Sequence, residues 1–246
     1  MSDAPSIPRR LGALALPDDP TLEAAPSGTR ALVARVWGER VRSELAAAQA
    51  FTRVAQRAIA AGLPREVQYL AARAVADEVR HAALCAALAE RAGAAPSWPS
   101  PPPPRDAGDD TALFVSSGCI QETLGSAFLQ ATLERAESPA ARFVARALLA
   151  DEVDHARIGW AWVAGLDETG KVTLGARLHG LLAACLGPWR ARLDALPAAG
   201  APAFGVLAPA TIRAEMRRAL EELVLPGFAH LGVPTGDAAR AIDALG

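Results

Sequence analysis

Apolar residues recur every three or four positions in two long stretches near the start of the chain. The first stretch runs from about residue 29 to 61 and places valine, alanine and aromatic side chains on one side of a helix. The second runs from about residue 64 to 91 with the same period. Gly62 ends the first pattern, and Pro64 suits the first turn of the next helix. The short link between them predicts an antiparallel helix hairpin.

Two similar stretches follow, from about residue 109 to 136 and from about 138 to 164. Between the two pairs lies a proline-rich segment, 94–108, which is long enough to cross from one end of a bundle to the other. The order hairpin, long crossover, hairpin is that of a four-helix bundle with one crossover connection. Three further helical patterns occur at about 172–195, 208–225 and 236–245.

These patterns divide the chain into three parts. Residues 1–28 carry five prolines and show no sustained period, so we expect a flexible arm or one draped over the surface. Residues 29–165 are expected to form the bundle. Residues 166–246 are expected to pack on it, because none of their helical patterns can bury its apolar side alone. The sequence therefore predicts an all-α protein.

The composition narrows the classes of function. With 25 basic and 27 acidic residues, the formal net charge of −2 gives no electrostatic attraction to nucleic acid or to an anionic membrane. No apolar run reaches the ~18–20 residues of a membrane span, and the first residues lack the pattern of a secretory signal. The three cysteines are isolated, which excludes a rubredoxin-type iron centre and fits a reducing compartment. We therefore expect a cytoplasmic protein.

The pattern Asp-Glu-Val-x-His occurs twice, at residues 77–81 and 151–155. In each copy the glutamate and the histidine stand three positions apart, which places them one above the other on the same side of a helix. A carboxylate oxygen and an imidazole nitrogen in that arrangement can bind one metal ion. The residues placed in this way are Glu78 and His81 in the first copy and Glu152 and His155 in the second.

One further glutamate lies on the apolar side of each of the other two predicted helices. Glu44 precedes Glu78, and Glu122 precedes Glu152, by similar intervals, each of which suits one helix hairpin. Four buried carboxylates without partners would be very costly, whereas two divalent cations balance their charge. The mixed carboxylate and imidazole set favours iron or manganese over zinc.

At these six positions the chain resembles the ferritin-like di-metal carboxylate superfamily. The resemblance covers about residues 29–165 and rests on six residues that occur in the right order. It implies a ferritin-like fold that holds two iron ions, two manganese ions or one of each. The ligands it implies are Glu44, Glu78 and His81 for one ion and Glu122, Glu152 and His155 for the other, with Glu78 and Glu152 as candidates to bridge.

The same resemblance implies a function for the aspartate that begins each copy of the motif. In methane-monooxygenase-type hydroxylases and ribonucleotide reductase small subunits, an aspartate at this place accepts a hydrogen bond from a ligand histidine of the opposite helix. Such a bond fixes the orientation and the tautomer of the imidazole. We therefore expect Asp77 to contact His155, and Asp151 to contact His81. The alternative is that both aspartates are exposed helix residues.

Small side chains accompany the expected ligands. Ser126, four residues after Glu122, resembles an active-site threonine of the bacterial hydroxylases. It is a candidate to relay protons, or else a small residue that leaves space. Glycine in a helix costs about 1 kcal/mol relative to alanine, so Gly118 is expected to serve a cavity or close packing. The residues expected to line such a cavity are Cys85, Cys119, Gly125 and Gly159.

Two other residues bear on the chemistry. His179, in the fifth predicted helix, is a candidate seventh ligand, because some arylamine N-oxygenases of the superfamily have an extra histidine. The alternative is a partly buried structural histidine. The only tyrosine, Tyr69, lies about three helical turns from His81, so a tyrosyl-radical role is not expected.

The leading hypothesis is a non-haem di-iron oxidoreductase that activates dioxygen to hydroxylate or N-oxygenate a small organic substrate. It would need an external electron donor. No nucleic-acid or membrane partner is expected, and a homodimer is left open. Two alternatives stay open: a ferritin-like protein that oxidises and stores iron, and a peroxide-handling enzyme similar to manganese catalase or rubrerythrin. The arm and the C-terminal helices favour the first hypothesis, because they suit the enclosure of a substrate pocket.

Overall fold

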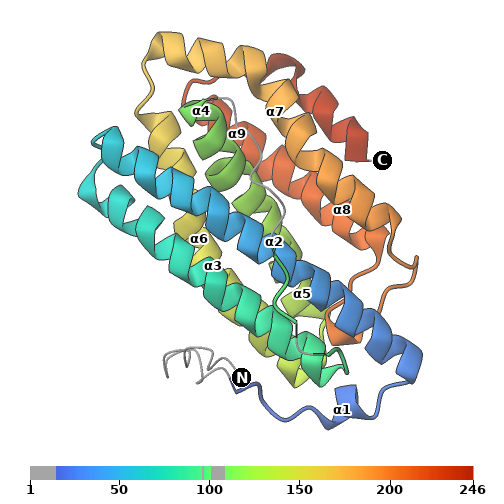
Figure 1. The fold of residues 1–246 in the computed structure, drawn as a ribbon. Coiled ribbons are helices and arrows are strands. Elements are labelled where there is room, and N and C mark those ends of the chain that lie inside the picture. The colour runs from blue at the N-terminus through green and yellow to red at the C-terminus, as the bar shows by residue number, and fades with distance from the viewer. Residues whose placement is uncertain (1–14, 96, 101–108, 246) are drawn as a thin grey trace.

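A computed structural model describes residues 15–95, 97–100 and 109–245, and most of these residues lie in helices (Figure 1). Among the described residues no strand forms beyond one isolated bridge, so the structure is all-α as the sequence predicts. The four long helices of the bundle are α2 (Ser27–Ala60), α3 (Arg65–Arg91), α5 (Glu122–Arg135) and α6 (Pro139–Ala164).

The helices α2 and α3 form the first antiparallel hairpin. The turn between them contains Gly62 at a φ of +63°, a conformation that glycine adopts at little cost. Pro64 precedes the first residue of α3, where its missing amide leaves no bond unmade. Trp37 and Phe51 of α2 are almost fully buried, so the apolar side predicted from the sequence faces the bundle.

The third long helix is not continuous. It begins as α4 (Asp110–Phe114), where the side chain of Asp109 accepts a hydrogen bond from the amide of Ala112 at 2.8 Å. Residues Val115–Gln121 then form a π-helix, η1, and α5 starts at Glu122. A π-helix has more residues per turn than an α-helix, so it changes the direction in which the following side chains point. The sequence predicts one uninterrupted α-helix here and does not reveal the change.

The helix α6 crosses η1 with its backbone in direct contact. A β-carbon added to Gly118 of η1 would lie 2.5 Å from the backbone nitrogen of Gly159 of α6. One added to Gly159 would lie 2.6 Å from the backbone nitrogen of Cys119. Neither position tolerates a side chain without movement of the backbone. Close packing therefore explains both glycines. The sequence predicts that Gly159 lines a cavity, but its α-carbon packs against the backbone of η1.

The described part of the N-terminal segment is docked on the bundle. The short helix α1 (Pro20–Glu23) follows Asp19, a buried residue whose Oδ1 accepts a hydrogen bond from the amide of Leu22 at 2.9 Å. The Oδ2 atom accepts from the hydroxyl of Ser138 and from the amide of Ala140 at 3.1 Å. Burial works against the charge of Asp19, but these hydrogen bonds keep its pKa below the ordinary value. One carboxylate thus joins this segment to the start of α6.

Two predicted segments lie partly outside the described residues. Of the flexible arm predicted for residues 1–28, residues 1–14 are not described. In the described remainder Asp19 holds the segment against the start of α6, and residue 27 already belongs to α2. Of the crossover predicted for 94–108, most residues lie outside the described part. The few that are described form no helix, as the prolines predict.

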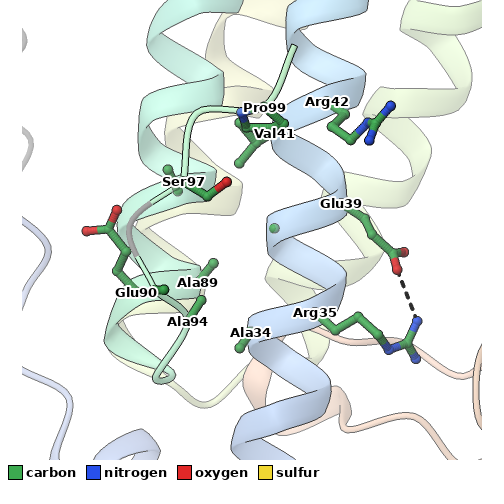
Figure 2. A pocket seen from close by; sticks show the side chains of 13 residues that line it. Ala34, Arg35, Glu39, Val41, Arg42, Ala89, Glu90, Ala94, Ser97 and Pro99 are labelled. Atoms are coloured by element: carbon green, nitrogen blue, oxygen red, sulfur yellow. Dashed lines mark hydrogen bonds and ion pairs between the residues drawn. The ribbon is translucent and has the colours of Figure 1, made fainter. Parts of the chain in front are cut away.

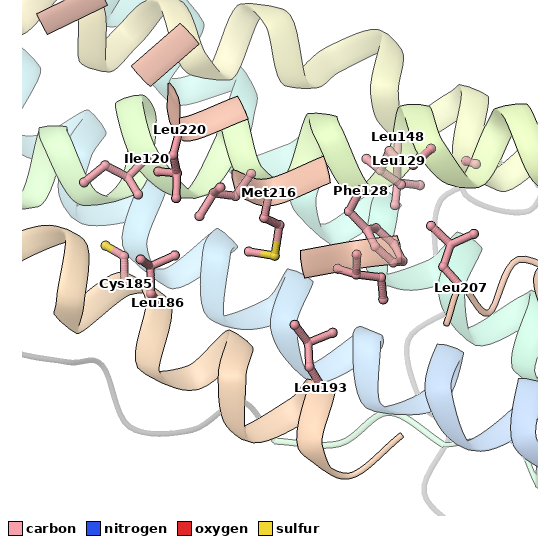
Figure 3. Packing of buried hydrophobic residues seen from close by; sticks show 14 of the residues in the cluster. Ile120, Phe128, Leu129, Leu148, Cys185, Leu186, Leu193, Leu207, Met216 and Leu220 are labelled. Carbon is pink, nitrogen blue, oxygen red and sulfur yellow. The ribbon is translucent and has the colours of Figure 1, made fainter. Parts of the chain in front are cut away.

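The C-terminal segments pack on the bundle and share its hydrophobic core. Figure 3 shows Leu186 and Met216 close to Ile120 and Phe128 of the third helix. None of the described helices is both long enough and apolar enough to span a membrane. The segments are α7 (Glu168–Asp194), α8 (Pro209–Ala219), the π-helix η3 (Leu220–Val224), α9 (Leu225–His230) and the 3₁₀-helix η4 (Gly236–Leu245).

Candidate metal centre

Six buried carboxylate and imidazole side chains gather between the four long helices, and none is more than 7% exposed. They form two groups, and in each group one oxygen or nitrogen atom per residue lies within 4.8 Å of the others. The first group is Glu44, Glu78 and His81, and the second is Glu78, Glu122, Glu152 and His155. The structure therefore brings together all six residues that the sequence predicts as ligands, with Glu78 in both groups.

Helix geometry explains why these side chains meet. Glu78 and His81 are three residues apart on α3, and Glu152 and His155 are three residues apart on α6, so each pair faces the same way. Glu122 is the first residue of α5, directly after the π-helix. The altered turn of η1 therefore helps to set the direction from which Glu122 enters the centre.

Each histidine is held by an aspartate of the opposite helix. The Nε2 atom of His81 lies 3.1 Å from Oδ2 of Asp151, and Nε2 of His155 lies 3.4 Å from Oδ2 of Asp77. The structure thus contains both contacts that the resemblance implies. The other ring nitrogen, Nδ1, faces the glutamates: in His155 it lies 3.1 Å from Oε1 of Glu78. We infer that Nδ1 is the nitrogen each histidine offers to a metal ion.

Four buried polar atoms of the cluster have no hydrogen-bond partner in the described structure. They are Oε2 of Glu78, Nδ1 of His81, Oε2 of Glu152 and Nδ1 of His155. The contacts between these groups are close but lack hydrogen-bond geometry. A buried polar atom without a partner is costly, so the four atoms together point to a ligand that they share. Carboxylate oxygens and imidazole nitrogens are donors that iron and manganese accept, so these residues fit a di-metal centre.

The charges inside the cluster shift several pKa values. Burial raises the pKa of Glu44 to about 8. Burial alone would also raise the pKa of Glu78, but the two histidines close to it lower it to about 2. Burial would lower the pKa of His81, whereas Asp151 and Glu78 raise it to about 10. The metal-free centre therefore retains protons to balance its carboxylates, and divalent cations supply the same positive charge when bound.

Two arginines hold the aspartates from the outer side, and sequence reasoning missed both. Arg73 lies 2.9 Å from Asp77 and 3.0 Å from Asp154, and Arg80 forms an ion pair with Asp151. Burial works against the charge of Asp77, but its bonds to the histidine and to Arg73 keep its pKa below the ordinary value. The signal was present in the motif itself, because Arg80 stands directly before its histidine.

Sequence reasoning also missed Arg40. Its Nε atom lies 2.8 Å from Oε1 of Glu44, and its side chain is only 14% exposed. The guanidinium carbon lies 4.7 Å from the centre of the Phe128 ring. Burial would lower the pKa of Arg40, but Glu44 and Cys85 beside it raise the value, so the group stays charged. An arginine one turn before a glutamate is common on helix surfaces, which hides this pair in the sequence.

The other residues predicted around the centre lie outside the two ligand groups. Cys85 and Cys119 are buried, and burial raises the pKa of both thiols well above the ordinary value. Such thiols stay protonated and unreactive. A β-carbon on Gly125 would meet nothing within 4 Å, so this glycine faces open space. Ser126 is half-buried on α5 and stays a candidate for proton relay.

His179 lies away from the centre. Its side chain is exposed on α7, and its Nδ1 atom lies 3.2 Å from the carbonyl oxygen of Asp237. It lines a surface hollow of about 560 Å³ together with Pro234 and Arg240. His179 belongs to neither ligand group, so it is not the seventh ligand that the sequence suggested. It faces the C-terminal residues because α7 packs outside the four-helix bundle.

A second hollow, of about 300 Å³, lies between α2 and α3 beneath the described part of the crossover (Figure 2). Gly38 and Ala89 line it, and Arg35 and Glu39 form an ion pair of 3.3 Å at its edge. Neither hollow is lined by any of the predicted cavity residues, Cys85, Cys119, Gly125 and Gly159. Both hollows therefore differ from the substrate cavity that the sequence suggested.

No family model and no curated protein matches the chain in sequence. Among solved structures the chain is similar to "Protein 19 with aldehyde deformylating oxidase activity from Synechococcus". The TM-score is 0.66 at 20% sequence identity, and the match covers 90% of this chain and 98% of that chain. The chain has the ferritin-like fold. Within this ferritin-like bundle, the buried glutamate and histidine cluster fits a di-iron site.

Proposed function

We propose that this ferritin-like bundle is a non-haem di-iron oxidoreductase that activates dioxygen to oxidise a small organic substrate. The observation that carries the proposal is the presence of Glu78 in both ligand groups, which supports two ions held side by side. The similar solved structure, which has aldehyde deformylating oxidase activity, supports an oxidative reaction. The proposed ligands are Glu44, Glu78 and His81 for one ion and Glu122, Glu152 and His155 for the other, with Glu78 bridging.

The protein's own residues would hold and shield the reacting centre. When bound, a pair of iron ions supplies redox chemistry with dioxygen. Asp77 and Asp151 hold the histidine rings, so that Nδ1 of each ring faces the centre. The near-complete burial of the six side chains excludes water, which strengthens electrostatic interactions and limits side reactions. Ser126, half-buried four residues after Glu122, would relay protons.

The proposed reaction is hydroxylation or N-oxygenation, with electrons from an external donor. Gly125, three residues after Glu122, faces open space, which supports access for a small substrate on this side of α5. Aldehydes are a further substrate class to assay, because the similar solved structure has aldehyde deformylating oxidase activity. Substrate screens should therefore compare an alkane, an arylamine and an aldehyde of similar size.

Anaerobic reconstitution with Fe²⁺, followed by metal analysis and addition of dioxygen, tests the proposal. The wild type should hold two iron ions per chain, one for each ligand group, and its optical spectrum should change when dioxygen is added. The Glu78→Ala variant should bind at least about tenfold less iron than the wild type, because it lacks the residue common to both groups. Glu66→Ala is the matched control, because Glu66 lies on the same helix but its side chain is 71% exposed.

Other results would point to other functions. Large iron-loaded assemblies on sizing would favour iron storage. Release of oxygen from peroxide by a manganese form would favour a catalase. A wild type that holds neither iron nor manganese, together with a Glu78→Ala variant of unchanged metal content, would remove the basis of the proposal.

A further inference from the structure

The two ligand groups differ at the position four residues before their first glutamate. Arg40 stands four residues before Glu44, whereas Gly118 stands four residues before Glu122. Residues four apart on an α-helix are neighbours, so Arg40 adjoins Glu44. Gly118 lies in the π-helix η1 and packs against the backbone of Gly159 of α6. One half of the centre therefore has a cation against its glutamate, and the other half has no side chain there.

Several contacts fix Arg40 in this place. Its Nε atom lies 2.8 Å from Oε1 of Glu44. The guanidinium carbon lies 4.7 Å from the ring centre of Phe128 and 5.9 Å from that of Trp37. With 14% of the side chain exposed, water and salt screen its charge poorly. The positive charge therefore acts on any ion bound at Glu44.

Glu122 has different surroundings. In the described residues its ion-pair contact is with His155, at 3.7 Å, which is itself a candidate ligand. The two outer arginines contact Asp77 and Asp151 rather than Glu122. The second group also offers four residues, against three in the first. Both features favour tighter binding of a cation in the second group.

We propose that Arg40 is a positioning residue that makes the two metal positions unequal. An ion fills the position of Glu122, Glu152 and His155 first, and the position of Glu44 and His81 fills second and more weakly. The reason is the repulsion between the guanidinium and a divalent ion that share one carboxylate. This proposal rests on the di-metal part of the proposed function, but not on the reaction with dioxygen.

Calorimetric titration of the metal-free wild type with Mn²⁺ at one fixed pH tests the proposal. We expect two binding phases whose dissociation constants differ by about tenfold or more. Arg40→Met keeps the bulk of the side chain and removes its charge, so it should tighten the weaker phase by about tenfold and leave the tighter phase nearly unchanged. Arg40→Lys keeps the charge and should retain both phases as in the wild type. Circular dichroism checks that each variant is folded, and Arg40→Gln is a second neutral variant.

Glutamate variants assign the two phases. Glu44→Gln should remove the weaker phase, and Glu122→Gln should remove the tighter one. If the neutral variants leave the weaker phase unchanged or weaken it, Arg40 merely holds Glu44 and the proposal fails. Two equal phases in the wild type also overturn it, while the di-metal centre stands. A wild type that binds no Mn²⁺ or Fe²⁺ overturns the proposed function as well.

Discussion

The two halves of the centre repeat their candidate ligands but differ in what surrounds them. In the half formed by α2 and α3, one hairpin turn separates the first glutamate from the Glu-x-x-His pair. In the half formed by η1, α5 and α6, the same order recurs over a slightly shorter interval of the chain. The ligands repeat because two ions need the same donors at the same helical phase. No such requirement acts on the neighbouring residues.

Three pairs of corresponding positions show the difference. They precede the first glutamate by four residues, precede the histidine by one, or follow the histidine by four. The first half has two arginines and a thiol at these positions, whereas the second has two glycines and an aspartate. The pairs are Arg40 and Gly118, Arg80 and Asp154, and Cys85 and Gly159. Two arginines therefore lie close to the first half, whereas two glycines bring α6 and η1 into backbone contact in the second. We expect substitutions in the two halves to have different effects.

The largest effect is expected where the second half is packed by backbone. Gly118→Ala places a β-carbon 2.5 Å from the nitrogen and 2.7 Å from the Cα of Gly159. Only a shift of the η1 or α6 backbone relieves this clash, so we expect a loss of at least about 3 kcal/mol in the free energy of unfolding. Urea denaturation of the wild type and the variant measures it.

Gly125→Ala is the control for that experiment. It adds the same methyl group to the same helical run, but at a site where the β-carbon meets nothing within 4 Å. Because alanine is the better helix former, the variant should be up to about 1 kcal/mol more stable than the wild type. Equal losses in the two variants would show that the crossing at Gly118 is not tight.

The next expected effect is that the free energy of unfolding of the metal-free protein depends on pH through residues of the first half. Folded Glu44 holds its proton up to a pKa of about 8, whereas an ordinary glutamate loses it near 4.5. As the pH rises from 5 to 8, the unfolded state therefore ionises first and the free energy of unfolding falls. The raised pKa of His81, about 10 against an ordinary 6.5, acts in the same direction from about pH 6.5 upward.

Urea denaturation of chelator-treated protein between pH 5 and pH 8 measures this loss, which we expect to reach several kcal/mol. Glu44→Gln should reduce the slope, because an amide has no proton to lose in this range. With metal bound, the slope should reverse, since ions replace the protons and bind better to deprotonated ligands. A metal-free wild type whose stability is constant across this range would contradict the shifted pKa of Glu44.

The smallest expected effect is a change in metal affinity when the aspartates of the two halves are substituted. Asp151→Asn and Asp77→Asn weaken the contacts to His81 and His155, so each should lower metal affinity by roughly 10- to 100-fold. Asp154→Asn is the matched control, because Asp154 contacts Arg73 and Arg157 and no histidine. Its effect should stay within about threefold. If Asp154→Asn weakens metal binding as strongly, the arginine network rather than the histidine contact determines the affinity.

The sequence predicts those parts of the molecule in which spacing alone decides geometry. Glu78 and His81 share one side of α3 because they are three residues apart, and the structure places them together. The sequence also predicts the hairpin turn at Gly62 and a helix that starts near residue 138, because glycine and proline act locally. The four-helix order follows from these local signals.

The rest depends on contacts between distant segments. The π-helix Val115–Gln121 keeps an apolar pattern that an α-helix would also show, so its different hydrogen bonding leaves little trace in the sequence. The burial of Arg40 depends in part on Phe128 from another helix. The partner of Asp19, Ser138, lies 119 residues away. None of these pairings can be read from residue types in one window.

The contact between Asp19 and the start of α6 limits how the chain can be shortened. The first amides of a helix have no partner within it, and Asp19 accepts from the amide of Ala140 and binds the capping residue Ser138. A fragment that starts after residue 19 would keep all six candidate ligands. It would nevertheless lose this acceptor at the first turn of the helix that carries Glu152 and His155. Shortened versions for crystallisation or spectroscopy should therefore begin before Asp19.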